Sequence, residues 1–80
     1  MTPAQVRDEL LRRMFAARGP AGLWLASAAA LALSWRTGPN GAPVLAPPTR
    51  LEVEALAHEA ADVDAADRDA ALGLLRGIAG

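Results

Sequence analysis

The only histidine of the chain, His58, lies one helical turn from Glu54 and one from Asp62, so an imidazole and two carboxylates could face one divalent cation. Zinc sites normally include a second histidine or a cysteine, and the chain has neither. The four aspartates between residues 62 and 69 lack the spacing and the closing glutamate of a calcium-binding loop. We therefore expect a solvated polar helix face here, and no metal site.

Catalytic patterns are also weak. The two serines in the apolar middle of the chain have no general base near them, so no nucleophile is indicated. Gly38 and Gly41 are not followed by the lysine that a phosphate-binding loop uses. An acid–base pair such as Glu52 and Glu59 needs a desolvated cleft, which an alanine-rich chain of 80 residues is poorly able to build. We expect neither an enzyme nor a bound cofactor.

The charges are unevenly distributed along the chain. Residues 1–50 hold six arginines and two acids, whereas residues 51–80 hold two arginines and seven acids, which gives a formal net charge of −1. Proteins that bind nucleic acid usually present a strongly basic face, so we expect no nucleic-acid ligand. We expect the two halves to attract each other within one fold. The absence of cysteine excludes disulfides.

Capping signals divide the chain into helices. Thr2 and Gln5 form the pattern of a capping box, with a proline at the first helical position between them. Thr49 and Glu52 repeat the capping box, and Asp64 is placed to cap the last helix. Apolar residues at helical spacing follow each signal. The predicted fold is all-α, a single domain over residues 1–80 with four helices at about 3–18, 21–35, 50–61 and 65–79.

Residues 37–48 separate the second and third predicted helices. Asn40 and Gly41 between short apolar runs are typical of a β-hairpin turn. Pro39 and Pro43 argue against a hairpin, because neither can donate a ladder hydrogen bond. We predict an ordered loop over this range, with a short hairpin as the alternative.

Residues 19–35 contain no charged side chain, which raises the alternative of a membrane span. Trp24 and Trp35 would then mark the two interfaces, but they are about 16 Å apart along a helix, far less than the roughly 30 Å of a hydrocarbon core. A signal peptide is a third interpretation, but the acidic residues Asp8 and Glu9 near the start of the chain argue against it. We favour a central helix enclosed by a small bundle.

The aromatic residues provide the candidate binding site. Trp24, Leu31 and Trp35 are predicted to share one face of the second helix, and Arg36 follows them. Tryptophan is frequent at protein interfaces, and so small a core leaves at least one tryptophan partly exposed. We therefore predict that these four residues bind a protein partner.

Residues 31–45 resemble a segment of short phage tail-assembly chaperones, in which an apolar helix ends in a Trp-Arg pair and a glycine-containing loop leads into another helix. The resemblance extends over about residues 21–61. The matching positions are Leu31, Leu33, Trp35, Arg36, Gly38, Gly41, Pro43 and Leu45. It implies a small helical protein that shields apolar segments of a tape-measure-like partner in the host cytoplasm while a tail assembles.

The sequence as a whole predicts a non-enzymatic protein-binding assembly factor, in the cytoplasm, of the tail-assembly chaperone type. Two alternatives stay open. One is a small single-span membrane subunit or regulator of a larger complex, which would use residues 19–35 as the span. The other is a structural subunit of a homo-oligomer.

Overall fold

Three of the four helices of the computed structural model, which describes residues 1–80, begin at a capping signal, and the helix that starts at Pro20 follows Gly19 without a side-chain cap. The Thr2 hydroxyl accepts a hydrogen bond from the Gln5 backbone N–H at 3.2 Å, and the Gln5 side chain accepts one from the Thr2 N–H at 2.8 Å. The Asp64 carboxylate accepts from the Ala66 N–H. The elements are α1 (Pro3–Ala16), α2 (Pro20–Ala32), β1 (Ser34–Thr37), β2 (Pro43–Ala46), α3 (Arg50–His58) and α4 (Ala65–Ile78).

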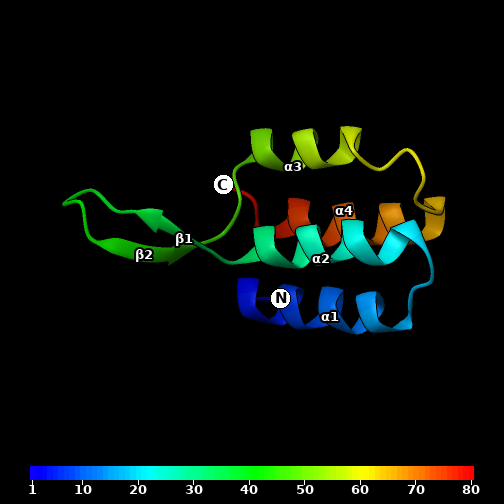
Figure 1. The fold of residues 1–80 in the computed structure, drawn as a ribbon. Helices are drawn as coiled ribbons and strands as arrows, with labels where there is room; N and C mark the ends of the chain where they lie inside the picture. Colours follow the sequence, from blue (N-terminus) through cyan, green and yellow to red (C-terminus); the bar gives the residue numbers. More distant parts are fainter.

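The four helices run alongside one another, and the β1–β2 hairpin projects from one end of the bundle (Figure 1). The α1–α2 and α3–α4 connections both lie at the opposite end (Figure 1). The molecule is accordingly elongated, with extents of 41 × 22 × 19 Å. The predicted all-α class is confirmed as a four-helix domain that also carries a two-stranded hairpin. None of the helices combines the length and apolarity that crossing a membrane requires.

Helix α2 is the centre of the core. Fifteen buried hydrophobic residues form one cluster, and α2 supplies six of them: Ala21, Trp24, Leu25, Ala28, Ala29 and Ala32. Alanine side chains on one face allow α1 to lie close against α2, because small residues let two helix backbones approach. The uncharged stretch is thus enclosed mainly by other helices of the same chain, as the bundle interpretation predicted.

Helix ends differ from the prediction more than helix starts do. Helices α1, α3 and α4 end at Ala16, His58 and Ile78, before the expected 18, 61 and 79. Helix α2 also ends early, at Ala32 instead of about residue 35. The Ser34 hydroxyl donates a hydrogen bond to the Ala30 carbonyl, the acceptor that the Ser34 N–H would use in a continuing helix.

Residues 34–46 form the hairpin, so the alternative prediction for this segment is correct and the loop prediction is wrong. The Gly41 N–H donates to the Gly38 carbonyl at 3.0 Å, and the Gly38 N–H donates to the Ala42 carbonyl at 2.8 Å. Only glycines have positive φ, which identifies a type I turn followed by a bulge at Gly41, whose φ is +78°. Pro39 occupies the second turn position, where its fixed φ favours this turn.

Pro43 is compatible with the hairpin because of its register. It lies opposite Thr37, next to the hydrogen-bonded Gly38–Ala42 pair. Hydrogen-bonded and non-hydrogen-bonded pairs alternate along an antiparallel ladder, so the nitrogen of Pro43 points away from β1 and no donor is missing. The sequence argument against a hairpin assumed a donor position that the register does not require.

We predict that Leu25→Ala lowers the free energy of unfolding by about 3 kcal/mol, because Leu25 is completely buried and its truncation leaves a cavity. Leu23→Ala in the same helix is the matched control, with an expected change below about 0.5 kcal/mol, since this side chain is exposed. Urea denaturation followed by circular dichroism measures both. Equal losses in the two variants would contradict the placement of α2.

Candidate protein-binding site

The structure separates the four residues predicted to bind a partner. Trp24 is buried in the core, and Leu31 is half-buried against it. Trp35 lies in β1 and is 68% exposed, while Arg36 is half-buried. The prediction that Trp24, Leu31 and Trp35 share one helix face is wrong, because α2 ends before Trp35. The prediction that at least one tryptophan is exposed is confirmed by Trp35.

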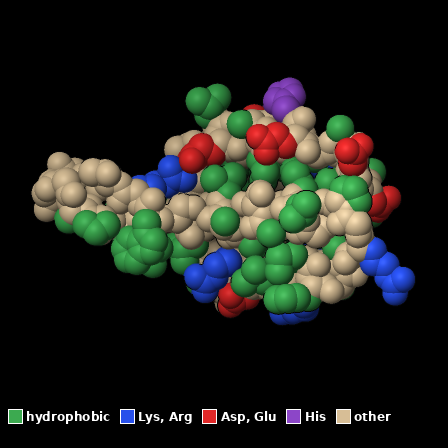
Figure 2. Space-filling view, in the orientation of Figure 1, with side chains coloured by type: hydrophobic (Ala, Val, Ile, Leu, Met, Phe, Trp, Pro, Cys, Tyr) green, Lys and Arg blue, Asp and Glu red, His purple; other side chains and the backbone are tan.

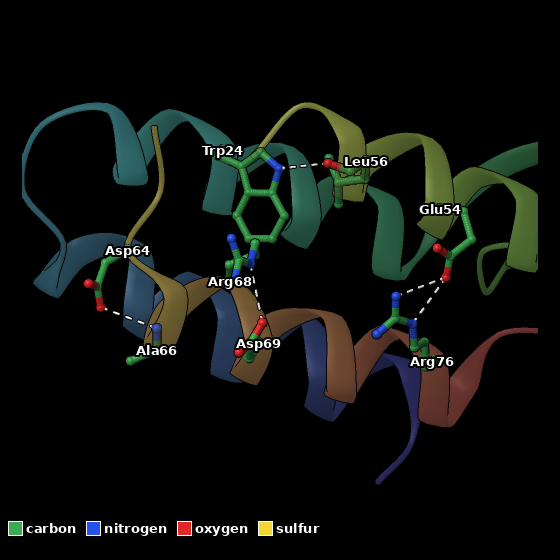
Figure 3. Close-up of polar contacts among 8 residues, drawn as sticks. All are labelled: Trp24, Glu54, Leu56, Asp64, Ala66, Arg68, Asp69 and Arg76. Carbon is green, nitrogen blue, oxygen red and sulfur yellow. Dashed lines mark hydrogen bonds and ion pairs between the residues drawn. The ribbon is translucent and has the colours of Figure 1, made fainter. Parts of the chain in front are cut away.

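Trp24 is a structural residue. Its indole nitrogen donates a hydrogen bond of 2.9 Å to the Leu56 carbonyl, across the space between α2 and α3 (Figure 3). A buried indole N–H without an acceptor would cost about 1–3 kcal/mol, so this bond allows the ring to fill the core. The contact leaves Trp35 as the tryptophan that is accessible from outside.

Trp35 and Leu45 form an apolar pair on one face of the hairpin. They are direct cross-strand partners, and both are exposed, Leu45 to 49%. Hydrogen-bonded and non-hydrogen-bonded pairs alternate along the ladder, so Trp35–Leu45, two positions from the non-hydrogen-bonded Thr37–Pro43 pair, is also non-hydrogen-bonded. Side chains lie closest together in pairs of this kind. Hydrophobic side chains gather on one side of the hairpin near its base (Figure 2). Trp35 and Leu45 therefore present a joined apolar surface.

Arg36 extends from the other face of β1 and connects the hairpin to α3. Its guanidinium donates to the Glu52 carboxylate at 2.6 Å. The same carboxylate accepts from the Thr49 backbone N–H at 2.9 Å, which completes the capping box of α3. The backbone bond from Thr49 and the bond from Arg36 lower the pKa of Glu52 below its usual value of 4.5. Glu52 thus caps a helix and holds the hairpin at once.

Sequence reasoning missed two members of this site. Leu45 was named only through the family resemblance, and Glu52 was assigned to helix capping alone. Taken as the usual two-residue turn, the Asn40–Gly41 signal would place Leu45 opposite Arg36, and the bulge at Gly41 shifts the register by one residue to place it opposite Trp35. No local pattern links Glu52 to Arg36, since 16 residues separate them and the fold brings them together.

The groups first considered for metal binding do not converge. No three of the histidine, aspartate and glutamate side chains lie where they could share a metal ion. Glu54 instead accepts two hydrogen bonds from Arg76 of α4, at 3.0 and 3.1 Å (Figure 3). Arg76, Glu54, Val53 and Arg50 line an open cavity of about 340 Å³.

Comparisons with protein-family models, curated proteins and solved structures gave no match for this chain. The resemblance of residues 21–61 to tail-assembly chaperones therefore stays a prediction. The candidate site is defined by its geometry alone: the exposed Trp35–Leu45 pair on a hairpin that the Arg36–Glu52 ion pair anchors to α3.

We predict a pH-dependent loss of stability that depends on Glu52. Because the pKa of Glu52 is lower in the folded state, ionised Glu52 stabilises the fold. This stabilisation is complete above 4.5, the pKa in the unfolded chain, and is lost as pH falls through the pKa of the folded state. Glu52→Gln keeps an acceptor for the Thr49 N–H and removes the charge. Near neutral pH the free energy of unfolding of the wild type should exceed that of this variant by less than about 1 kcal/mol. The difference between the two proteins should shrink below pH ~4.5. Urea titrations of both proteins across this range give the measurement, and a difference independent of pH would refute the prediction.

Proposed function

We propose that this protein is a non-enzymatic assembly factor of the phage tail-assembly chaperone type, which shields apolar segments of a tape-measure-like client in the host cytoplasm. The observation that carries the proposal is the exposed Trp35–Leu45 pair at the base of a projecting hairpin. The family resemblance supports it by implying the class of client. The contact surface consists of Trp35 and Leu45, with Arg36 as the residue that positions them.

Burial of this pair supplies energy for binding. Removing a large apolar side chain from water contributes about 1.5–3 kcal/mol, and tryptophan is enriched among the residues that dominate interface energies. The protein has only three aromatic residues, and it leaves one of its two tryptophans outside the core. That arrangement is unfavourable in the free protein and becomes favourable when a partner covers the ring.

The hairpin is held in place before any partner arrives. A two-stranded hairpin alone is marginally stable in water, so it needs contacts beyond its own ladder. The Arg36–Glu52 ion pair provides one. At the entry to α3, the Gly80 N–H donates to the Pro48 carbonyl at 3.1 Å, and the Arg50 N–H donates to the Gly80 carbonyl at 3.3 Å. Such pre-organisation lowers the entropic cost of binding.

The charge of the hairpin indicates the chemistry of the client. Arg36 is the only charged residue between positions 34 and 46, and Glu52 neutralises it. A client that covers the hairpin therefore gains apolar burial and finds no unpaired charge to match. An uncharged apolar segment fits this surface better than a charged one, as the chaperone proposal requires.

We predict that Trp35→Ala and Leu45→Ala each abolish the ability of this chain to keep a tape-measure-like protein from the same genome soluble when the two are co-expressed. Val44→Ala is the matched control, since Val44 lies in the same strand but on the face of Arg36, and it should retain full activity. The measurement is the soluble yield of the client with each variant. Unchanged client solubility with Trp35→Ala would sink the proposal.

The two tryptophans provide an independent readout. In the Trp24→Phe variant, all tryptophan fluorescence comes from Trp35, which is exposed in the free protein. We predict that its emission shifts to shorter wavelength when the purified client is added. In the Trp35→Phe variant, where only the buried Trp24 emits, the spectrum should barely change. A spectral shift confined to Trp24 would place the contact elsewhere.

A further inference from the structure

The end of the bundle opposite the hairpin carries a second exposed apolar surface. Phe15 in the last turn of α1 and Leu23 in the first turns of α2 are 81% and 80% exposed. Both lie next to the α1–α2 connection, at the end where the α3–α4 connection also lies (Figure 1). This location separates them from the Trp35–Leu45 pair by the length of the bundle. The proposed client site therefore leaves them unexplained.

A groove of about 240 Å³ lies beside Leu23. It runs between the start of α2 and the α3–α4 connection, and its lining combines three apolar side chains with two carboxylates. The lining residues are Pro20, Leu23, Trp24, Ser27, Glu59, Asp62 and Val63.

At this end of the bundle, a positively charged side chain and two negatively charged ones form no ion pair. Among the nine acidic residues, only Glu59 and Asp62 form neither an ion pair nor a helix cap. Six of the eight arginines form ion pairs, and Arg18, directly before the α1–α2 turn, is one of the two that do not. Arg18, Glu59 and Asp62 are all exposed. We call Phe15, Arg18, Leu23, Glu59 and Asp62 the turn-end surface.

We propose that the turn-end surface binds a second copy of this chain across a two-fold axis. A surface that carries an unpaired cation and two unpaired carboxylates can complement itself, because a two-fold axis makes every contact twice. Arg18 of each copy would face Glu59 and Asp62 of the partner subunit, with Leu23 and Phe15 between them. The formal net charge of −1 per chain opposes such an approach only weakly.

The size of this surface makes the dimer weak. The two shorter extents of the molecule, 22 and 19 Å, limit an end-to-end contact to about 400 Å² per copy. Stable interfaces usually bury about 800 Å² per partner. We therefore expect dimers that form only at high concentration and that dissociate when salt screens the exposed charges. The two hairpins would lie at the far ends of this dimer, pointing away from each other.

Sedimentation velocity between about 10 µM and about 1 mM tests the dimer. Wild type should shift from monomer to dimer over this range. Arg18→Glu alone, and Glu59→Arg with Asp62→Arg, should each raise the dissociation constant at least about tenfold, because every attraction between residue 18 and the two carboxylate positions becomes a repulsion. An equimolar mixture of the two variants should dimerise like wild type, since every reversed charge then meets an opposite one. Arg7→Glu, in the first half of α1, is the control for the change in net charge and should dimerise normally.

Each result decides for or against the dimer. A wild type that stays monomeric at the highest concentration overturns it, and so does a mixture that fails to restore association. Trp35→Ala should dimerise like wild type, so loss of client binding and loss of the dimer are measured separately. If Trp35→Ala instead abolishes dimerisation, the copies meet through their hairpins and the turn-end surface is not the contact. Circular dichroism verifies that each variant is folded.

Discussion

The enclosure of α2 is the constraint on which the other features of this structure depend. Its uncharged, alanine-rich sequence must be covered, and α1 and α4 pack directly against it. Helix α3 joins them through the hydrogen bond from Trp24 to the Leu56 carbonyl. Because this bond commits Trp24 to the core, the large exposed apolar side chains lie toward the two ends of the bundle, with Leu23 at the start of α2 among them.

Local signals in the sequence predicted the helix starts well, because a capping box involves residues only three positions apart. Helix ends were predicted less well. The end of α2 depends on the Ser34 hydroxyl, which takes the Ala30 carbonyl, and on pairing of β1 with a strand that begins at Pro43. Residues 31–37 alternate between apolar side chains and small or polar ones, a pattern that fits a strand as well as the end of a helix, and only the pairing with β2 decides between the two.

The candidate site was predictable in composition but not in geometry. The small number of large apolar residues correctly indicated an exposed tryptophan, yet the helical periodicity assigned Trp24 and Trp35 to one surface. The two prolines were misjudged for a related reason: their effect depends on turn position and register, which only the paired strands define. The role of Glu52 in holding Arg36 depends on tertiary structure and has no signature in either segment.

The ion pairs give the two ends of the molecule different physical characters. Within the hairpin, the ion pair with Glu52 neutralises Arg36, the only charged side chain, so association there depends on apolar burial, which salts such as sulfate strengthen. At the opposite end, Arg18, Glu59 and Asp62 stay unpaired, so association there depends on exposed charges, which any salt weakens. Two contacts that respond oppositely to ionic strength can operate independently on a chain of 80 residues, because the full length of the bundle separates them.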